Sequence, residues 1–157
     1  MFKYDGSAIV PGGAIAVPEL RTLRNMWLDI SAPRSVPRMQ RFDVRWISTC
    51  RVCVVSVKGL YAFEYLFVGR GIANPDLQGL TGKSLSDDPD SEHATVAAWH
   101  FQEAVDERLP VCRHVRGRLG GEAYEYIRLV LPLSTTGNTV DRLLVGVHGL
   151  KAPRLAA

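Results

Sequence analysis

The last third of the chain consists of β-rich segments joined by very short turns, and this feature constrains the fold most. The segments 111–118, 123–133 and 140–148 are separated only by a Gly120-Gly121 pair and by a polar turn at 136–138. Turns this short join antiparallel neighbours, because parallel strands need a crossover of a dozen or more residues. The sequence therefore predicts an antiparallel sheet in this region.

A second hairpin is predicted in the middle of the chain. The β-branched run 51–57 and the aromatic run 61–68 are separated by a turn that begins after Lys58 and Gly59. Strict alternation would place every second residue of the later run on one face of the sheet. That face would carry Tyr61, Phe63, Tyr65 and Phe67. Together with the three later segments, this hairpin gives five predicted strands.

Two helices are predicted from the spacing of apolar residues. Segment 18–30 begins with Pro18, which suits the first turn of a helix, and repeats apolar residues at helical spacing. Segment 92–108 aligns small residues with Phe101 and Val105 and stops before Pro110. The predicted fold class is α+β, a five-stranded antiparallel sheet with helices on one face and an N-terminal amphipathic helix covering the other.

The chain has 157 residues, of which 46% are hydrophobic and 22% charged, and this composition is typical of one soluble globular domain. We interpret residues 1–17 as a flexible N-terminal arm, 18–150 as the domain and 151–157 as a tail. The side chains expected in the core are Phe101, Val105, Leu129, Leu131, Leu143 and Val145.

Charge is unevenly distributed along the chain. Residues 21–51 hold seven arginines and two aspartates, residues 73–107 hold eight acids and one lysine, and residues 108–118 hold four arginines and no acid. A nucleic-acid-binding protein usually presents a single basic field, so this pattern favours self-association or a protein partner instead. The alternative to such a partner is that these charges lie on solvent-exposed faces and compensate one another within the chain.

Three cysteines in a chain of this size favour a reducing compartment, and we expect a cytoplasmic protein. The apolar runs are too short for a transmembrane helix, and the N-terminal residues do not form a convincing signal peptide. We therefore expect neither a membrane nor a nucleic acid among the partners.

Several segments, in this order, resemble the PAS domain, a sensor module, and in particular a bacterial subfamily of small stand-alone proteins. They lie within residues 20–149 and are 23–28, 63–72, 80–85, 126–134 and 137–144. The resemblance implies a sensory or regulatory domain in signal transduction, which binds a small molecule between sheet and helix or pairs with another protein. It also implies a homodimer formed through the N-terminal helix, on which Met26 and Leu28 are apolar outside the main stripe. The alternative is that these two side chains pack on the connection 33–49 within one chain.

A ligand site, if present, is expected between helix 92–108 and the sheet. The candidate lining residues are Tyr65, Phe67, Trp99, His100, Phe101, Cys112, His114 and Tyr126. Strand alternation prevents all of them from pointing inward. Neither the ligand nor the signalling partner is indicated by the sequence, and a ligand-free interaction and dimerisation module is the alternative.

The histidines and cysteines are the residues that could bind a cofactor or a metal ion. Some PAS domains bind haem through a histidine on or near this helix, and by that resemblance His100 is the best candidate for an axial ligand. Cys50 and Cys53 have a spacing known from zinc sites, and Cys112 and His114 could complete a set of four. On a strand, however, residues three apart point to opposite faces, so we interpret the cysteines as small core residues and predict no metal.

Enzymatic function is not expected. Gly82-Lys83-Ser84 resembles the end of a phosphate-binding loop, but the glycine required five positions earlier is Leu77. A small cone-shaped enzyme fold would need an acid–base pair in one pocket, and the spacing pairs none of the tyrosines with Asp141.

Overall fold

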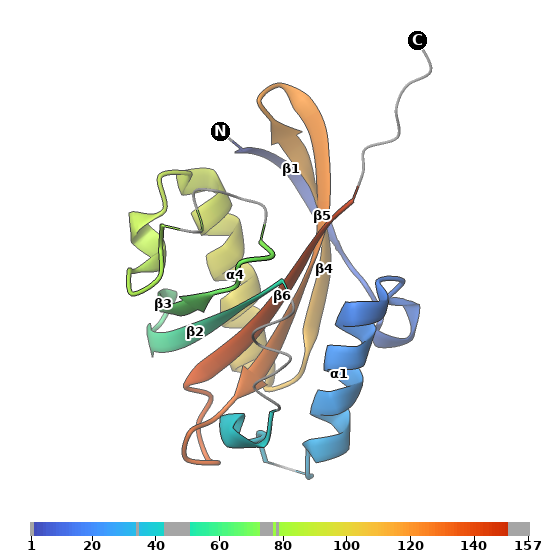
Figure 1. Cartoon of the computed structure of the whole chain (residues 1–157), viewed down its shortest axis with the longest axis vertical. Coiled ribbons are helices and arrows are strands. Elements are labelled where there is room, and N and C mark those ends of the chain that lie inside the picture. The colour runs from blue at the N-terminus through green and yellow to red at the C-terminus, as the bar shows by residue number, and fades with distance from the viewer. Residues whose placement is uncertain (1, 34, 43–50, 73–76, 78, 151–157) are drawn as a thin grey trace.

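The computed structural model describes residues 2–33, 35–42, 51–72, 77 and 79–150 (Figure 1). Two α-helices and six strands form the regular structure of this part of the chain, together with short 3-10 turns. In chain order they are β1 (Phe2–Ile9), α1 (Pro18–Ile30), β2 (Val52–Gly59), β3 (Ala62–Val68), α4 (Ser91–Glu107), β4 (Val111–Leu119), β5 (Glu122–Leu133) and β6 (Arg142–Leu150). The 3-10 turns are η1 (Gly12–Ala14), η2 (Met39–Arg41) and η3 (Leu85–Asp87).

The six strands form one sheet in the order β1-β4-β5-β6-β2-β3, and every neighbouring pair is antiparallel. Figure 1 shows the sheet between helices α1 and α4, with α4 on one face and α1 on the other. The predicted α+β class, antiparallel pairing and covering helices are confirmed. No helix in the described part of the chain is long and apolar enough to cross a membrane.

The predicted strand number was wrong, because the sheet has six strands and not five. The additional strand, β1, lies within residues 1–17, which the sequence favoured as a flexible arm. It pairs along the free edge of β4, from Phe2 opposite Leu119 to Ile9 opposite Arg113. An irregularity in this pairing between Tyr4 and Gly6 interrupts the alternation by which a strand is recognised in a sequence.

The core has two layers, one on each side of the sheet. On the α1 face, Leu20, Leu23 and Trp27 pack against β5 residues such as Leu129, and on the α4 face Phe101 packs against β2, β3 and β6. Of the six expected core residues, all except Val105 are buried, and Val105 is half-buried against the α4-face cluster. We call these layers the α1-face and α4-face clusters.

Candidate functional site

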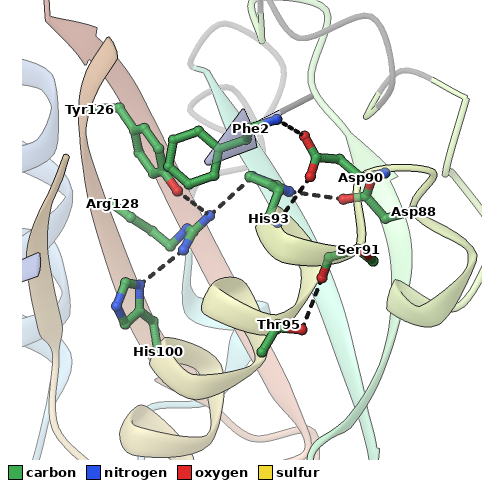
Figure 2. Close-up of polar contacts among 9 residues, drawn as sticks. All are labelled: Phe2, Asp88, Asp90, Ser91, His93, Thr95, His100, Tyr126 and Arg128. Atoms are coloured by element: carbon green, nitrogen blue, oxygen red, sulfur yellow. Dashed lines mark hydrogen bonds and ion pairs between the residues drawn. The ribbon is translucent and has the colours of Figure 1, made fainter. Parts of the chain in front are cut away.

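A buried arginine lies at the centre of the layer between α4 and the sheet. Arg128 of β5 is 2% exposed. One terminal nitrogen of its guanidinium lies 2.9 Å from Nδ1 of His100, and the other lies 3.2 Å from Nε2 of His93 and 3.3 Å from the hydroxyl of Tyr126 (Figure 2). We call these four residues, with Asp88, the Arg128 cluster.

Local sequence spacing explains how the cluster is assembled. His93 and His100 are seven residues apart on α4, which is about two helical turns, so both rings project from one face. Tyr126 and Arg128 are two apart on β5 and therefore share a face of the sheet. Asp90 caps α4 by accepting a hydrogen bond from the His93 amide, which determines where the helix begins.

The hydrogen-bond partners determine the form of both imidazoles. An arginine side chain only donates hydrogen bonds, so the histidine nitrogens that face Arg128 must present lone pairs. His93 therefore carries its proton on Nδ1 and donates it to Asp88, whose Oδ2 is 2.8 Å away. His100 carries its proton on Nε2. Both rings are neutral in this arrangement, and a chain of bonds connects the guanidinium to the Asp88 carboxylate.

Burial and the arginine charge determine the electrostatics of the cluster. Burial, with Arg128 as the next cause, lowers the pKa of His100 from 6.5 to about 3. Burial raises the pKa of the Cys53 thiol to about 12 and also raises the pKa values of Tyr65 and Tyr126. The histidine at position 100 and the neighbouring thiol and phenols are thus neutral at pH 7.

The guanidinium is not fully hydrogen-bonded. Nε of Arg128 is buried and has no hydrogen-bond partner among the residues that the structure describes. The rings of Tyr126 and Phe101 lie 5.1 Å and 5.9 Å from the guanidinium carbon, within the range of cation–π attraction. Aromatic faces therefore supply part of the stabilisation that water would give an exposed arginine.

Strand β1 closes one side of the cluster. The ring of Phe2 is 6.3 Å from that of His93 and 5.9 Å from that of Tyr126, measured between centroids. The Phe2 amide donates to Oδ2 of Asp90 at 2.6 Å, as Figure 2 shows. Phe2 is 2% exposed, so its ring separates this side of the cluster from water.

The structure brings together four of the eight residues that the sequence predicted around a ligand site. Tyr65, His100, Phe101 and Tyr126 lie on the α4 face, either in its cluster or in contact with Arg128. Trp99 is 50% exposed and packs edge-on against Tyr4. Three consecutive helix residues cannot all face the sheet, because each is rotated by about 100° from the one before.

The other three predicted residues lie on the α1 face. Cys112 belongs to the α1-face cluster, Phe67 packs against it, and His114 pairs in register with Ile127 of that cluster. For Phe67 the expectation of one aromatic face on β3 was wrong. The register shifts between the pairs Val54–Phe67 and Val55–Tyr65, and this irregularity turns Phe67 to the opposite side.

A cavity of about 170 Å³ also lies on the α1 face, not between α4 and the sheet. Its lining includes the apolar residues Leu20, Leu23 and Val52 and the polar residues Glu19, Arg51 and His148. On the α4 face, Phe63 and Phe101 meet edge to face at a centroid distance of 5.3 Å. The predicted ligand layer is therefore occupied at that point by the protein's own side chains.

Cys53 and Cys112 are buried free thiols, as predicted for small core residues, and they belong to clusters on opposite faces. Cys50, the third cysteine weighed as a zinc ligand, lies outside the described residues. Within the described ranges, no group of three His, Cys, Asp or Glu side chains is arranged to hold a metal ion.

Arg128, Asp88 and Phe2 were not among the site residues predicted from the sequence. One signal was available, because Arg128 interrupts an otherwise apolar run from 126 to 133, and a charged residue inside a buried strand requires partners. His93 and His100 at their seven-residue spacing were the natural candidates for those partners. Comparisons with protein-family models, with curated proteins and with solved structures give no match.

Proposed function

We propose that the chain is a PAS-like sensory or regulatory domain in signal transduction, which acts through protein–protein contacts and has an interior packed with its own side chains. The order of the elements supports this proposal. Helix α1, hairpin β2–β3, a crossover containing α4, and the three strands β4–β6 follow one another as the PAS resemblance implies. Strand β1 is an addition to that order.

One observation favours protein contacts over a bound small molecule. Phe63, Phe101 and the Arg128 cluster fill the part of the layer between α4 and the sheet where a ligand was expected. A domain with such an interior would have to signal through its surface. The proposal includes a cytoplasmic location, which suits the buried free thiols Cys53 and Cys112, and it assigns no catalytic activity.

The proposal also includes a homodimer that uses helix α1. Met26 packs against the α1-face cluster within its own chain, whereas Leu28 is 40% exposed on the outer side of the helix. Leu20 and Trp27 are buried in that cluster, so an aspartate at either position would unfold the domain instead of testing an interface. Leu28 is therefore the residue to change.

Light scattering at tens of micromolar protein tests the homodimer. We expect a dimer for the natural chain and a folded monomer for Leu28→Asp. Leu119→Asp is the matched control, because Leu119 is 46% exposed at the end of β4 and distant in sequence from α1. A monomeric natural chain, or a Leu28→Asp variant that remains dimeric, contradicts this interface.

The second candidate function is a ligand-binding sensor, and the unpartnered Nε of Arg128 favours it. Native mass spectrometry and an absorbance spectrum of the purified protein distinguish the two functions. Masses of the chain alone support the packed interaction domain. An added mass supports the ligand-binding sensor, and a haem absorbance band lost in His100→Ala would identify haem as the ligand.

A further inference from the structure

The first half of β1 is attached to the start of α4 as well as to β4. The Phe2 amide donates to Asp90, and the Tyr4 amide donates to Oε1 of Glu92 at 2.9 Å. These bonds link the edge strand to acidic side chains at the helix N-terminus. Three carboxylates, those of Asp88, Asp90 and Glu92, therefore lie beside the point where β1 meets α4.

The docked position of Phe2 depends on a glycine on β4. A Cβ atom at Gly117 would lie 2.5 Å from the ring of Phe2 and 2.2 Å from the carbonyl oxygen of Lys3. Both distances are too short for any side chain at that position. The absence of a side chain at Gly117 thus creates the space in which β1 approaches β4 and Phe2 covers His93.

His93 connects this docked strand to the buried arginine. Its amide and the Phe2 amide bond to the two oxygens of one carboxylate, that of Asp90. Its ring contacts the ring of Phe2, donates to Asp88 through Nδ1 and accepts from Arg128 through Nε2. The only nitrogen of this ring that can take up a proton is therefore the one that faces the guanidinium.

A proton on Nε2 changes this contact from attractive to repulsive. The protonated nitrogen is a donor that faces another donor at 3.2 Å. The positive charges of His93 and Arg128 then lie next to each other in a buried site. The ring can relieve the repulsion by turning away from Arg128, which removes its contact with Phe2. Protonation and docking of β1 on α4 therefore oppose each other.

We propose that His93 is a proton-responsive latch, which holds the first half of β1 against α4 when neutral and releases it when protonated. Release would expose the edge of β4 and the N-terminal part of α4 to a partner. The latch is a property of the single folded chain and does not depend on the proposed function.

Some of the ionisable groups around His93 favour its protonated form, and others oppose it. Asp88, Asp90 and Glu92 favour the imidazolium form, and Arg128 opposes it. Tyr126, and Tyr65 and Cys53 farther along the α4-face cluster, are neutral at pH 7 because burial raises their pKa values. His100 is neutral over the working range of the latch, since its pKa is lowered to about 3. When β1 is released, water screens the repulsion between the guanidinium of Arg128 and the protonated ring of His93.

Amide hydrogen exchange at pH 7.5 and pH 5.5, corrected for intrinsic rates, tests the latch on the full chain. We expect the amides of Phe2, Lys3 and Tyr4 to exchange faster at pH 5.5 than at pH 7.5, because a proton on Nε2 of His93 would make its contact with Arg128 repulsive. The amides of β5 should keep their protection. Unchanged exchange in β1, or a parallel loss of protection in β5, overturns the proposal.

Two variants and one control complete the test. His93→Gln can donate to Asp88 and accept from Arg128 but does not titrate, so exchange in β1 should no longer depend on pH. Phe2→Ala should expose the β1 amides already at pH 7.5. His114→Gln is the matched control, because this histidine pairs with Glu125 away from the cluster. Exchange in β1 of this variant should depend on pH as it does in the natural chain. A His93→Gln variant that still releases β1 at pH 5.5 contradicts the latch.

Discussion

Neighbouring residues on β5 belong to two different kinds of interior. Leu129 packs among the apolar side chains of the α1-face cluster, whereas Arg128 points to the α4 face, where it bonds to two histidines and a tyrosine. Apolar contacts depend on volume and tolerate similar shapes, whereas buried polar groups require a partner at a defined distance and angle. The two faces of one sheet should therefore respond differently to the same kind of substitution.

A buried hydrogen bond on the α1 face is not indicated by the sequence pattern. Nε1 of Trp27 donates to the carbonyl oxygen of Pro132 at 2.7 Å. This bond satisfies the indole while its ring fills the core between α1 and β5. Even the apolar face thus uses a directional contact to define how the helix lies on the sheet.

Arg128→Ala should have the largest effect on stability. It leaves His93, His100 and Tyr126 buried without their donor, and we expect the free energy of unfolding to fall by about 3–5 kcal/mol, as for a broken buried ion network. Arg128→Met fills the same space without a charge and should cost less. Urea unfolding of both variants measures the difference. Equal losses would show that the bonds of Arg128 contribute no more than its volume.

Leu129→Ala and Leu129→Met are the matching pair on the α1 face. Alanine should cost about 2–5 kcal/mol by leaving a cavity, and methionine less than about 1.5 kcal/mol.

Gly146→Ala tests how closely α1 approaches the sheet. A Cβ at this β6 position would lie 2.6 Å from Cδ2 of Leu20, so helix or side chain must shift, and we expect a loss of about 1–3 kcal/mol. Gly13→Ala is the control, because no atom lies within 4 Å of its added Cβ. Thermal unfolding of both variants measures the contrast. A Gly146→Ala variant as stable as the control would contradict tight packing on this face.

The α4 face should make stability depend on pH through His100. Unfolded His100 binds a proton below pH 6.5, whereas the folded residue binds one only below about pH 3. Unfolding therefore takes up a proton between these values, and stability should fall by about 1.4 kcal/mol per pH unit on acidification. Urea unfolding at pH 7, 6 and 5 measures this slope. The slope should decrease in His100→Gln, and an unchanged slope would assign the acid sensitivity to other groups.

The smallest effect is expected at the ion pair between α4 and β4. Arg113 and Glu103 are 2.8 Å apart, but their side chains are 21% and 26% exposed. Glu103→Gln should therefore cost less than about 1 kcal/mol, and added salt should reduce the difference further. Unfolding in 0.05 M and 1 M sodium chloride checks this expectation. A loss comparable to that in Arg128→Ala would mean that this pair, and not the buried cluster, holds α4 to the sheet.

Several residues of the candidate site could be predicted from the sequence, but their contacts with one another could not. The seven-residue spacing of His93 and His100 on one helix face could be read directly, and both rings do face the same partner. Arg128 could be recognised as a charge inside a buried strand, but its contact with the two histidines joins residues that are 28 and 35 positions apart along the chain. The docking of Phe2 on Asp90 spans 88 residues and lies beyond local patterns altogether.

The sequence by itself determined α1, α4, the three hairpin pairings β2–β3, β4–β5 and β5–β6, and the division of β5 into two faces. These features depend on spacing, turns and breakers within a few residues of one another. Only the tertiary structure decided that β1 joins the edge of β4, that an irregularity in β3 turns Phe67 away from Tyr65, and that Arg128 meets two histidines. Such features depend on free strand edges, register and close fit between distant segments, for which a short stretch of sequence carries no signal.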